Sequence, residues 1–166
     1  MAASSNAFSN GSVHLEEIAD RISAGESMES VMERLDWKGF EAAIASVFEA
    51  NDFRVSRNFR FKIGRRYEID LVCSRNGRTV LVDCKRWCGG RCKVSALKDA
   101  VSAQKTRAEE FAKLMRSDGS ARKKLCISTD SAAQPLIVTM MEEAIIESGG
   151  CFIVPAWKLN GFLLDI

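Results

Sequence analysis

The apolar and polar residues follow two different periods along the chain. Apolar residues recur at helical spacing over about residues 13–35 and 37–51; Gly25 is expected to divide the first segment and Asp36 to cap the second. From Phe53 to Ile63 most apolar residues take one parity and most polar residues the other. This alternation predicts a half-exposed strand after the helices.

The next two apolar runs, at about residues 66–74 and 78–86, flank the pair Asn76-Gly77. An Asn-Gly pair between apolar runs is a strong hairpin signal, so the runs are predicted to form antiparallel strands. The remaining pattern predicts, in order, a helix at about 94–116, a strand at 123–129, a helix at 134–148 and strands at 151–154 and 162–166. This order indicates an α/β fold with a mixed central sheet and helices on both faces.

Length and composition indicate one domain with a short appendage. The chain has 166 residues; we expect a flexible segment with short helices in residues 1–35 and the main domain in residues 36–166. No apolar run approaches the roughly 20 residues of a membrane span, and the first residues do not resemble a signal peptide. The sequence therefore predicts a cytoplasmic protein with no membrane contact, whose six cysteines are reduced.

Positive charge is concentrated in one part of the chain. From Arg54 to Lys93 there are twelve Lys and Arg residues against three Asp and Glu residues, although the net charge of the whole chain is only +2. Such a local basic block indicates a surface for a polyanion, and a solvated, Arg-rich sheet edge is the alternative. The single histidine, His14, precedes the main domain, which argues against a Ser-His-Asp triad there.

Three charged residues interrupt the predicted hairpin strands: Asp70, Asp83 and Lys85. Asp70 lies six residues before Asn76 and Asp83 six residues after Gly77, so ideal two-residue hairpin pairing places the two carboxylates opposite each other. Opposed like charges repel, and a chain tolerates them when a cation lies between them.

Two carboxylates at short range form a site for a hard divalent cation, Mg²⁺ or Mn²⁺. Lys85 projects from the same strand face as Asp83 and can hold a water or offset charge on a phosphate. Glu41, at the margin of the apolar stripe of the 37–51 helix, is either a third carboxylate of this site or a solvated charge. Glu68 shares a face with Asp70, so it is either an extra ligand or the partner of Arg66, and the pair is preferred.

The stretches EIDLV at residues 68–72 and LVDCKRW at 81–87 resemble the PD-(D/E)xK nuclease superfamily. The ending CKRW, the glycine-containing loop and the stretch KVSALKDAV are similar to Mrr-like restriction endonuclease domains. The resemblance covers roughly residues 37–128; Asp70 matches the first acid of the motif and Asp83-Cys84-Lys85 its acid-x-Lys triplet. Ile69 stands where the nominal pattern has proline.

This resemblance implies a restriction-endonuclease-like core of order α-β-β-β-α-β and a Mg²⁺-dependent (or Mn²⁺-dependent) endonuclease that hydrolyses DNA phosphodiester bonds. It implies that Asp70, Asp83 and the Cys84 carbonyl ligate the metal and that Glu41 ligates it through water or holds a second ion. Lys85 would position the attacking water, and Gln104 would orient Lys85 or contact the phosphate backbone. The basic residues expected to contact phosphate groups are Arg60, Lys62, Arg65, Arg66 and Arg86.

Other functions are weighed against this one. A Holliday junction resolvase would use the same chemistry in a homodimer, whereas a non-catalytic nucleic-acid-binding module has no need for opposed carboxylates. Cys84, Cys88 and Cys92 recur every fourth residue and, with Cys73, Cys126 or Cys151, form an alternative zinc or iron–sulfur site, although buried free thiols are common. Trp87 either stacks on a base or packs against a helix, and packing is preferred.

Overall fold

The computed structural model describes residues 15–87, 94–128, 132–140 and 142–166. Two short helices, α1 (Leu15–Ser23) and α2 (Met28–Glu33), precede the longer helix α3 (Trp37–Ala50). Gly25 lies between the short helices with a φ of 93°, and the Asp36 side chain accepts a hydrogen bond from the Gly39 N–H at the start of α3. The predicted interruption at Gly25 and the predicted cap at Asp36 are both confirmed.

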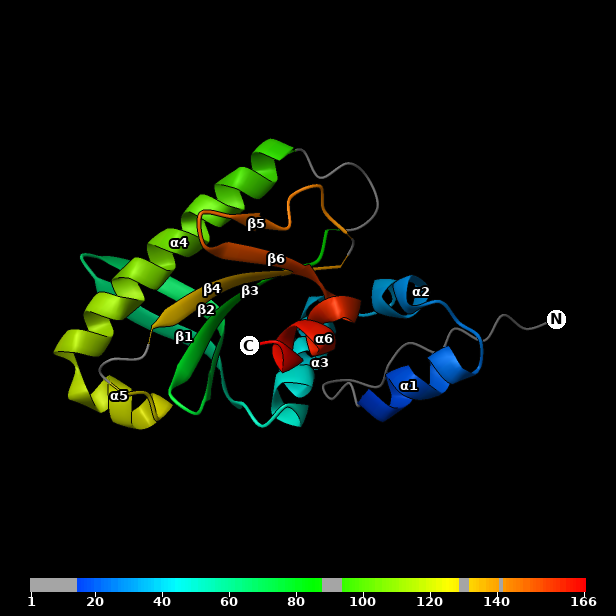
Figure 1. The fold of residues 1–166 in the computed structure, drawn as a ribbon, viewed down its shortest axis with the longest axis horizontal. Coiled ribbons are helices and arrows are strands. Elements are labelled where there is room, and N and C mark those ends of the chain that lie inside the picture. The colour runs from blue at the N-terminus through cyan, green and yellow to red at the C-terminus, as the bar shows by residue number, and fades with distance from the viewer. Residues whose placement is uncertain (1–14, 88–93, 129–131, 141) are drawn as a thin grey trace.

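A mixed sheet of six strands forms the centre of the described part of the chain (Figure 1). The strands are β1 (Arg54–Ile63), β2 (Arg65–Arg75), β3 (Arg78–Lys85), β4 (Ala133–Thr139), β5 (Glu147–Ser148) and β6 (Cys151–Pro155). Their order across the sheet is β1-β2-β3-β4-β6-β5, in which β3, β4 and β6 run parallel and the outer pairs are antiparallel. The predicted mixed α/β architecture is confirmed.

Helices cover both faces of this sheet (Figure 1). The helices α3 and α6 (Leu159–Leu164) pack on one face. There Phe40, Phe48 and Leu163 share a core with Val82 and Leu136, called the α3 face core below. The helices α4 (Val94–Ser117) and α5 (Gly119–Leu125) pack on the other face. The buried residues there, among them Phe111 and Leu97, are called the α4 face core below. The run α3-β1-β2-β3-α4-β4 follows the expected order α-β-β-β-α-β, with the short helix α5 added before β4.

The helix predicted over residues 134–148 is wrong, because this region contains β4 and the short strand β5. Leu136, Ile137 and Val138 are buried in β4, which lies between β3 and β6. A strand buried on both faces reads as a continuous apolar run, and such a run has no period that separates it from a buried helix. The pattern is ambiguous at this point, and only the neighbouring strands decide it.

Two shorter strand predictions are also wrong. The strand predicted at 123–129 is occupied by α5 up to Leu125, because the Asp118 side chain accepts hydrogen bonds from Ser120 N–H and Ala121 N–H and starts a helix there. The strand predicted at 162–166 coincides with the end of α6, whose Leu163 is buried in the α3 face core. The strand predicted at 151–154 is confirmed by β6.

The hairpin of β2 and β3 has the predicted turn and the predicted register. Pairing begins at Arg75–Arg78 and continues to Leu71–Val82. Asn76 and Gly77 have φ values of 49° and 79°, as the two central residues of a type I′ turn require. The pairing stops there, one step before the position at which the same register would set Asp70 opposite Asp83.

The strands β1 and β2 change faces at the level of Asp70. Phe53 packs in the α3 face core and Phe59 in the α4 face core, although the two residues have the same parity. Asn58 lies between them with a φ of 51°, and a left-handed residue in a strand rotates the part that follows. The two neighbours of Asp70 in β2 likewise belong to opposite cores: Ile69 lies in the α4 face core and Leu71 in the α3 face core. Asp70 therefore lies where the regular alternation of the strand is broken.

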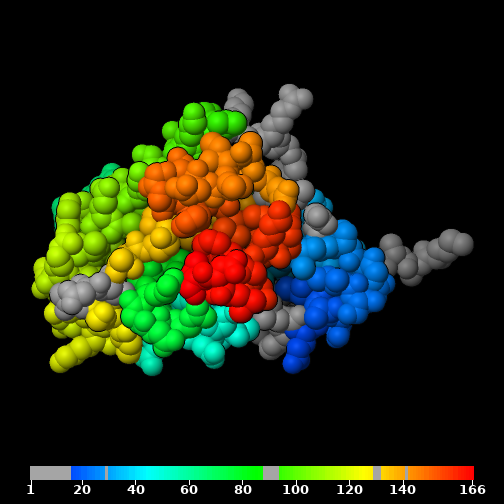
Figure 2. All heavy atoms as spheres, in the orientation of Figure 1, coloured from blue at the N-terminus to red at the C-terminus, as the bar shows by residue number. Residues whose placement is uncertain are grey.

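Arg75 joins the turn end of the hairpin to the C-terminal helix. Its guanidinium group donates to the carbonyl oxygens of Asn51 at 3.0 Å, Leu163 at 3.3 Å and Ile166 at 2.8 Å. It also lies over the Phe53 ring at 4.3 Å from the ring centroid. Figure 2 shows the C-terminal residues, in red, on the surface beside green residues of the hairpin region.

The N-terminal helices pack against the same core as α3. Val31, Met32 and Leu35 are buried there together with Phe40. The predicted division at residue 35 stays a prediction, and residues 1–14 lie outside the described part of the chain. Among the described residues, no helix combines the length and the apolar composition needed to cross a membrane.

Candidate active site

The Asp70 carboxylate replaces a main-chain acceptor at the open end of the hairpin. Pairing of β2 with β3 stops at Leu71–Val82, one step before Asp70 and Asp83. Asp70 Oδ2 accepts a hydrogen bond from the Cys84 N–H at 2.8 Å. Burial raises the pKa of Asp70, the Cys84 N–H opposes this shift, and the charge of Asp83 adds to it.

Asp83 and Lys85 form an ion pair on β3, where their spacing of two residues puts them on one face. The side chain of Asp83 is 6% exposed and that of Lys85 is 24% exposed. Lys85 Nζ donates a hydrogen bond to Asp83 Oδ1 at 3.1 Å and lies 2.9 Å from Oδ2. Oδ2 is thus close enough for ion pairing, yet it accepts no hydrogen bond of good geometry from the described residues.

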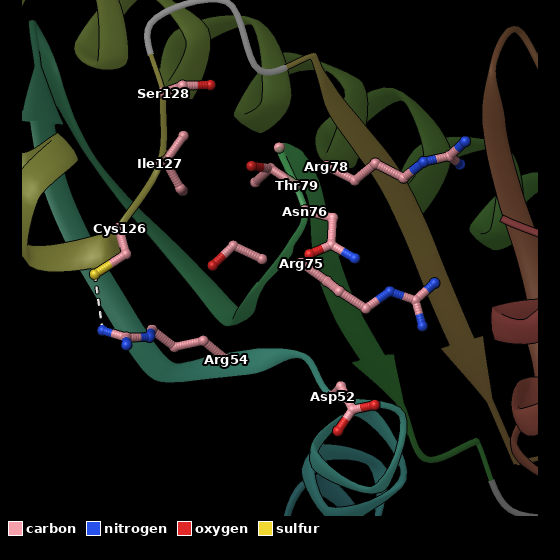
Figure 3. A pocket seen from close by; sticks show the side chains of 11 residues that line it. Asp52, Arg54, Arg75, Asn76, Arg78, Thr79, Cys126, Ile127 and Ser128 are labelled. Carbon is pink, nitrogen blue, oxygen red and sulfur yellow. Dashed lines mark hydrogen bonds between the residues drawn. The ribbon is translucent and has the colours of Figure 1, made fainter.

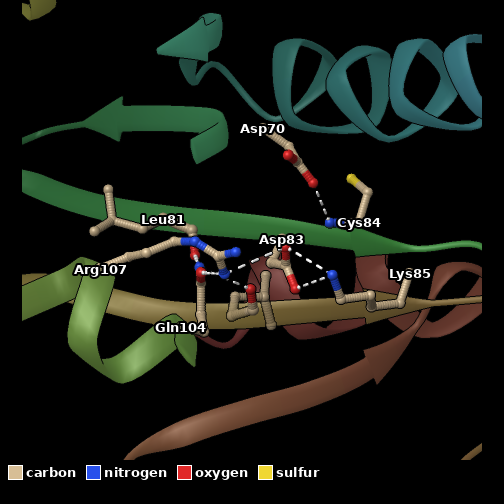
Figure 4. A network of polar contacts seen from close by, with 8 residues as sticks. Asp70, Leu81, Asp83, Cys84, Lys85, Gln104 and Arg107 are labelled. Carbon is tan, nitrogen blue, oxygen red and sulfur yellow. Dashed lines mark hydrogen bonds and ion pairs between the residues drawn. The ribbon is translucent and has the colours of Figure 1, made fainter. Parts of the chain in front are cut away.

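A second cation, Arg107 on α4, also reaches Asp83 (Figure 4). Arg107 Nη1 lies 3.5 Å from Asp83 Oδ1 and donates a hydrogen bond to Gln104 Oε1 at 3.2 Å. Gln104 is fully buried, and its Nε2 donates to the Leu81 carbonyl at 2.7 Å. Gln104 thus bonds to Arg107 and to the strand backbone rather than to Lys85, and its complete burial keeps it from a phosphate backbone.

Arg107 is the residue of this network that the sequence pattern did not single out. It follows Gln104 by three residues, so the two side chains share one face of α4. This spacing, combined with the expectation that Gln104 faces the site, is the signal that could have identified Arg107. Its charge alone was uninformative, because α4 carries charged residues along its whole length.

Glu41 on α3 approaches the site from the side of Asp70. Burial raises the pKa of Glu41, the charge of Asp70 raises it further, and the Trp37 side chain opposes the shift. Electrostatic coupling of this kind requires the two carboxyl groups to be close. The pKa shift indicates that Glu41 and Asp70 interact, and the role of Glu41 as a third carboxylate of the site stays a prediction.

Carboxylate oxygens are the type of ligand that a hard divalent cation prefers. In the described ranges, no three His, Cys, Asp or Glu side chains are gathered closely enough to form a metal site as they stand. Two observations nevertheless fit an oxygen-ligated cation: Asp83 Oδ2 contacts the Lys85 ammonium but accepts no hydrogen bond from the described residues, and the pKa of both Asp70 and Glu41 is raised in part by a neighbouring carboxylate. A divalent cation would relieve that repulsion, so the donor set fits Mg²⁺ or Mn²⁺.

The cysteines do not assemble into a site in the described part of the chain. Cys84 is buried in the α3 face core and Cys151 in the α4 face core, so these two thiols cannot share one metal ion. Burial raises the pKa of Cys84 well above its usual value and that of Cys151 to about 12, which keeps both as neutral thiols. Cys88 and Cys92 lie outside the described residues.

One of the five basic residues expected to contact phosphate, Arg60, has an acidic partner that was expected to pair with Arg66. Arg60 pairs with Glu68 at 3.0 Å, which corrects the predicted pair between Glu68 and Arg66. The reason is the register of β1 with β2, which places Arg60 directly opposite Glu68 and Arg66 opposite Lys62. Lys62 and Arg66 are exposed beside each other next to the β1–β2 connection.

The remaining two basic residues are held by the protein. Arg65 lies over the Tyr67 ring, 4.9 Å from its centroid. Arg86, which directly follows β3, donates a hydrogen bond to the Glu33 carbonyl at the end of α2 at 2.9 Å. Trp87 packs with Leu97 and Ile137 in the α4 face core, as preferred over base stacking.

A pocket of about 240 Å³ lies at the opposite end of the hairpin, around the Asn76-Gly77 turn (Figure 3). It does not include Asp70, Asp83 or Lys85. Figure 3 shows Arg54 turned toward Cys126, whose Sγ lies 2.7 Å from Nη1, while Arg78 points away from them. Because the guanidinium groups do not converge, the pocket is not assigned as an anion site, and the candidate chemistry lies at the other end of the hairpin.

Comparison with other proteins agrees with the geometry of the hairpin. The family model Mrr_cat, described as restriction endonuclease, matches residues 32–133. An uncharacterized protein of Archaeoglobus fulgidus is 30% identical over 131 residues, which cover 78% of this chain and 91% of that protein.

Two solved structures are more distant. The crystal structure of a protein of unknown function, AF1548, has 17% identity and a TM-score of 0.36 over 75% of this chain. That of protein VC1899 from Vibrio cholerae has 13% identity and a TM-score of 0.39 over 90% of this chain. The chain spans 54% and 34% of the lengths of these two proteins. The family match covers most of the chain and includes the hairpin, α4 and the network of Figure 4, so the protein belongs to the Mrr_cat restriction endonuclease family.

Proposed function

We propose that this protein is an endonuclease that hydrolyses DNA phosphodiester bonds with the help of Mg²⁺ or Mn²⁺. The observation that carries the proposal is the arrangement at the open end of the hairpin: Asp83 and Lys85 form an ion pair on β3, and Asp70, which is coupled electrostatically to Asp83 and Glu41, accepts the neighbouring Cys84 N–H. Membership of a restriction endonuclease family supports the reaction class, and such domains generally use divalent metals.

Each residue of the site has a distinct part in the proposed reaction. Asp70, Asp83 and Glu41 are the carboxylates that would hold the cation, together with the Cys84 carbonyl. A bound divalent cation supplies a lowered pKa for water and stabilises negative charge on a phosphate. Lys85 Nζ, held 2.9 Å from Asp83, is placed to donate to a water or to a phosphate oxygen next to the carboxylates.

The exposed basic residues of β1 and β2 would hold the DNA backbone. Arg60, Lys62, Arg65 and Arg66 are exposed along these strands, of which β2 lies next to β3 and β1 forms the edge of the sheet. Contacts from such residues to phosphates position a duplex without reading its sequence. Lys62 and Arg66 lie opposite each other without an acidic partner in the described residues, so they are the best placed for this role.

A cleavage assay tests the proposal directly. Labelled linear duplex, single-stranded DNA and a four-way junction are incubated with Mg²⁺, Mn²⁺ or EDTA and with wild-type protein or the Lys85→Ala variant. We expect metal-dependent cleavage by the wild type and none by Lys85→Ala, with DNA binding by the variant retained in a mobility-shift assay. Lys124→Ala is the matched control, because Lys124 is an exposed lysine on α5 remote from the hairpin's open end.

The outcomes separate the candidate functions. Cleavage of duplex supports a restriction-type endonuclease, and cleavage confined to the four-way junction supports a resolvase, which sedimentation analysis should then show to be a homodimer. DNA binding without cleavage under every metal condition contradicts the proposed reaction and supports a binding module. Cleavage that survives in Lys85→Ala shows that the assignment of the lysine is wrong.

A further inference from the structure

Arg107 connects the candidate metal ligand Asp83 to the backbone of the sheet. Its Nη1 is shared between Gln104 Oε1 at 3.2 Å and Asp83 Oδ1 at 3.5 Å. Figure 4 shows Arg107 reaching Asp83 from α4, on the opposite side of the carboxylate from Lys85.

The orientation of Gln104 is settled by its partners. Its Nε2 lies 2.7 Å from the Leu81 carbonyl and 3.4 Å from the Leu136 carbonyl, and only an amide nitrogen can donate to two carbonyl oxygens. Its Oε1 therefore faces Arg107 as an acceptor. Because Gln104 is fully buried and bonded to β3 and β4, it offers Arg107 a fixed point.

The two oxygens of Asp83 are used differently. Lys85 Nζ lies 3.1 Å from Oδ1 and 2.9 Å from Oδ2, whereas Arg107 Nη1 has its nearest contact with Oδ1, at 3.5 Å, and Oδ2 accepts no hydrogen bond among the described residues. Lys85 bridges both oxygens, so it does not by itself select one of them. Arg107 has its nearest contact with Oδ1 and so distinguishes the two oxygens.

We propose that Arg107 is a positioning residue for the metal ion, which holds Asp83 through Oδ1, anchored by Gln104, and leaves Oδ2 to the divalent cation. This inference rests on the proposed function, because it takes Asp83 as a metal ligand. It adds that part of the metal affinity is set by a residue on α4 that does not itself touch the ion. With Arg107 as the fixed counter-ion of Asp83, Lys85 is left for water or phosphate.

Metal binding measured without DNA tests this role. Titration calorimetry with Mn²⁺ compares the wild type with Arg107→Met, Gln104→Leu, the double variant and Arg107→Lys. Loss of a group that orients a metal ligand typically weakens metal binding by about 10- to 100-fold, and we expect this loss for Arg107→Met. Because Gln104 acts through Arg107, the double variant should bind Mn²⁺ no more weakly than the single variant with the lower affinity. If the two substitutions only destabilised the protein independently, their losses of affinity would add in free energy.

The lysine variant keeps the test informative if Arg107→Met fails to fold. Arg107→Lys retains the charge near Asp83 but has no fork to span Gln104 and Asp83, so it should recover the fold and only part of the metal affinity. Mn²⁺ affinity within about twofold of wild type in both Arg107→Met and Arg107→Lys would overturn the inference, as would losses that multiply in the double variant.

The wild type and Asp83→Asn separate this inference from the proposed function. If the wild type binds Mn²⁺ and Asp83→Asn does not, the metal site stands, and the Arg107 variants alone decide the positioning role. If the wild type fails to bind Mn²⁺, the proposed metal-dependent reaction fails and the inference fails with it.

Discussion

The two ends of the β2–β3 hairpin carry the same strands but satisfy their polar groups in different ways. At the turn end, main-chain pairing is regular from Leu71–Val82 to Arg75–Arg78, and Asn76 and Gly77 adopt the turn conformation that these residue types favour. At the open end, pairing stops, and the Asp70 side chain accepts the Cys84 N–H instead. The turn end is built for pairing, and the open end holds groups whose charge is costly to bury.

The open end keeps its charges because other elements supply partners. Asp83 is nearly buried but is approached by Lys85 from its own strand and by Arg107 from α4. Asp70 and Glu41 have no such cation in contact among the described residues, and the pKa of each is raised by burial. A region that accepts this cost while the rest of the hairpin is regular is a candidate for function rather than for stability.

The largest expected difference between the two ends is in catalysis. We expect Asp83→Asn to lower the rate of DNA cleavage by at least about a hundredfold, because it removes a charge that would hold the cation at the reacting phosphate. Asp52→Asn is the matched control, since Asp52 is an exposed residue beside the pocket at the turn end. The measurement is single-turnover cleavage of labelled duplex in Mg²⁺, and an equal loss in both variants would remove the distinction.

The turn end should dominate in stability. Gly77 has a φ of 79° and no atom within 4 Å of the position that a Cβ would take, so Gly77→Ala adds backbone strain without a clash. We expect the free energy of unfolding to fall by about 1–2 kcal/mol, measured by urea denaturation. Gly161→Ala is the matched control: Gly161 lies in α6 with equally open space and no positive φ, so alanine there should not destabilise the protein. Cleavage per folded molecule should be unchanged in both variants.

The pH dependence of stability should reveal the cost of burying an ionised carboxylate at the open end. The pKa of Asp70 is raised in the folded protein, so the stability that its protonated form contributes is complete below the ordinary value of 3.8 and is lost as the pH rises through the folded pKa. Asp70→Asn cannot ionise and can still accept the Cys84 N–H. In EDTA, we therefore expect it to be more stable than wild type at pH 7, by a margin that shrinks as the pH is lowered toward 3.8.

Urea denaturation at several pH values checks the Asp70→Asn prediction. A constant difference between variant and wild type across the range would show that Asp70 does not carry the expected cost. Added Mg²⁺ should make the wild type more stable than Asp70→Asn at pH 7, because only the wild type has the carboxylate that would bind the cation.

The smallest expected effect concerns the surface charges of β1. Arg60 and Glu68 form an exposed pair, and exposed pairs contribute little to stability, so Arg60→Ala should leave the unfolding midpoint unchanged. If Arg60 contacts a phosphate, the variant should bind DNA more weakly and lower the salt dependence of log K by about one. Arg78→Ala, at the turn end, should leave that slope unchanged, and anisotropy titrations across NaCl concentrations compare the two.

Local sequence was enough to predict the hairpin and the position of its charged residues. The turn at Asn76-Gly77 depends on the conformational freedom of these two residues. The pairing from Arg75–Arg78 to Leu71–Val82, which leaves Asp70 and Asp83 at the open end, follows from counting outward from the turn. The common face of Asp83 and Lys85 follows from the period of a strand. The length and position of α3 and α4 followed in the same way from helical period and a cap at Asp36.

Tertiary structure decided what depends on neighbours far along the chain. The run Leu136–Val138 became a strand because β3 and β6 lie on either side of it, and its apolar pattern alone is equally that of a buried helix. Glu68 paired with Arg60 because cross-strand register brings those two residues together. Arg107 joined Asp83 because α4 packs on the sheet face where Gln104 reaches the strand backbone. Local period determines the face on which a side chain lies, whereas its partner depends on which elements pack there, and that is a property of the whole fold.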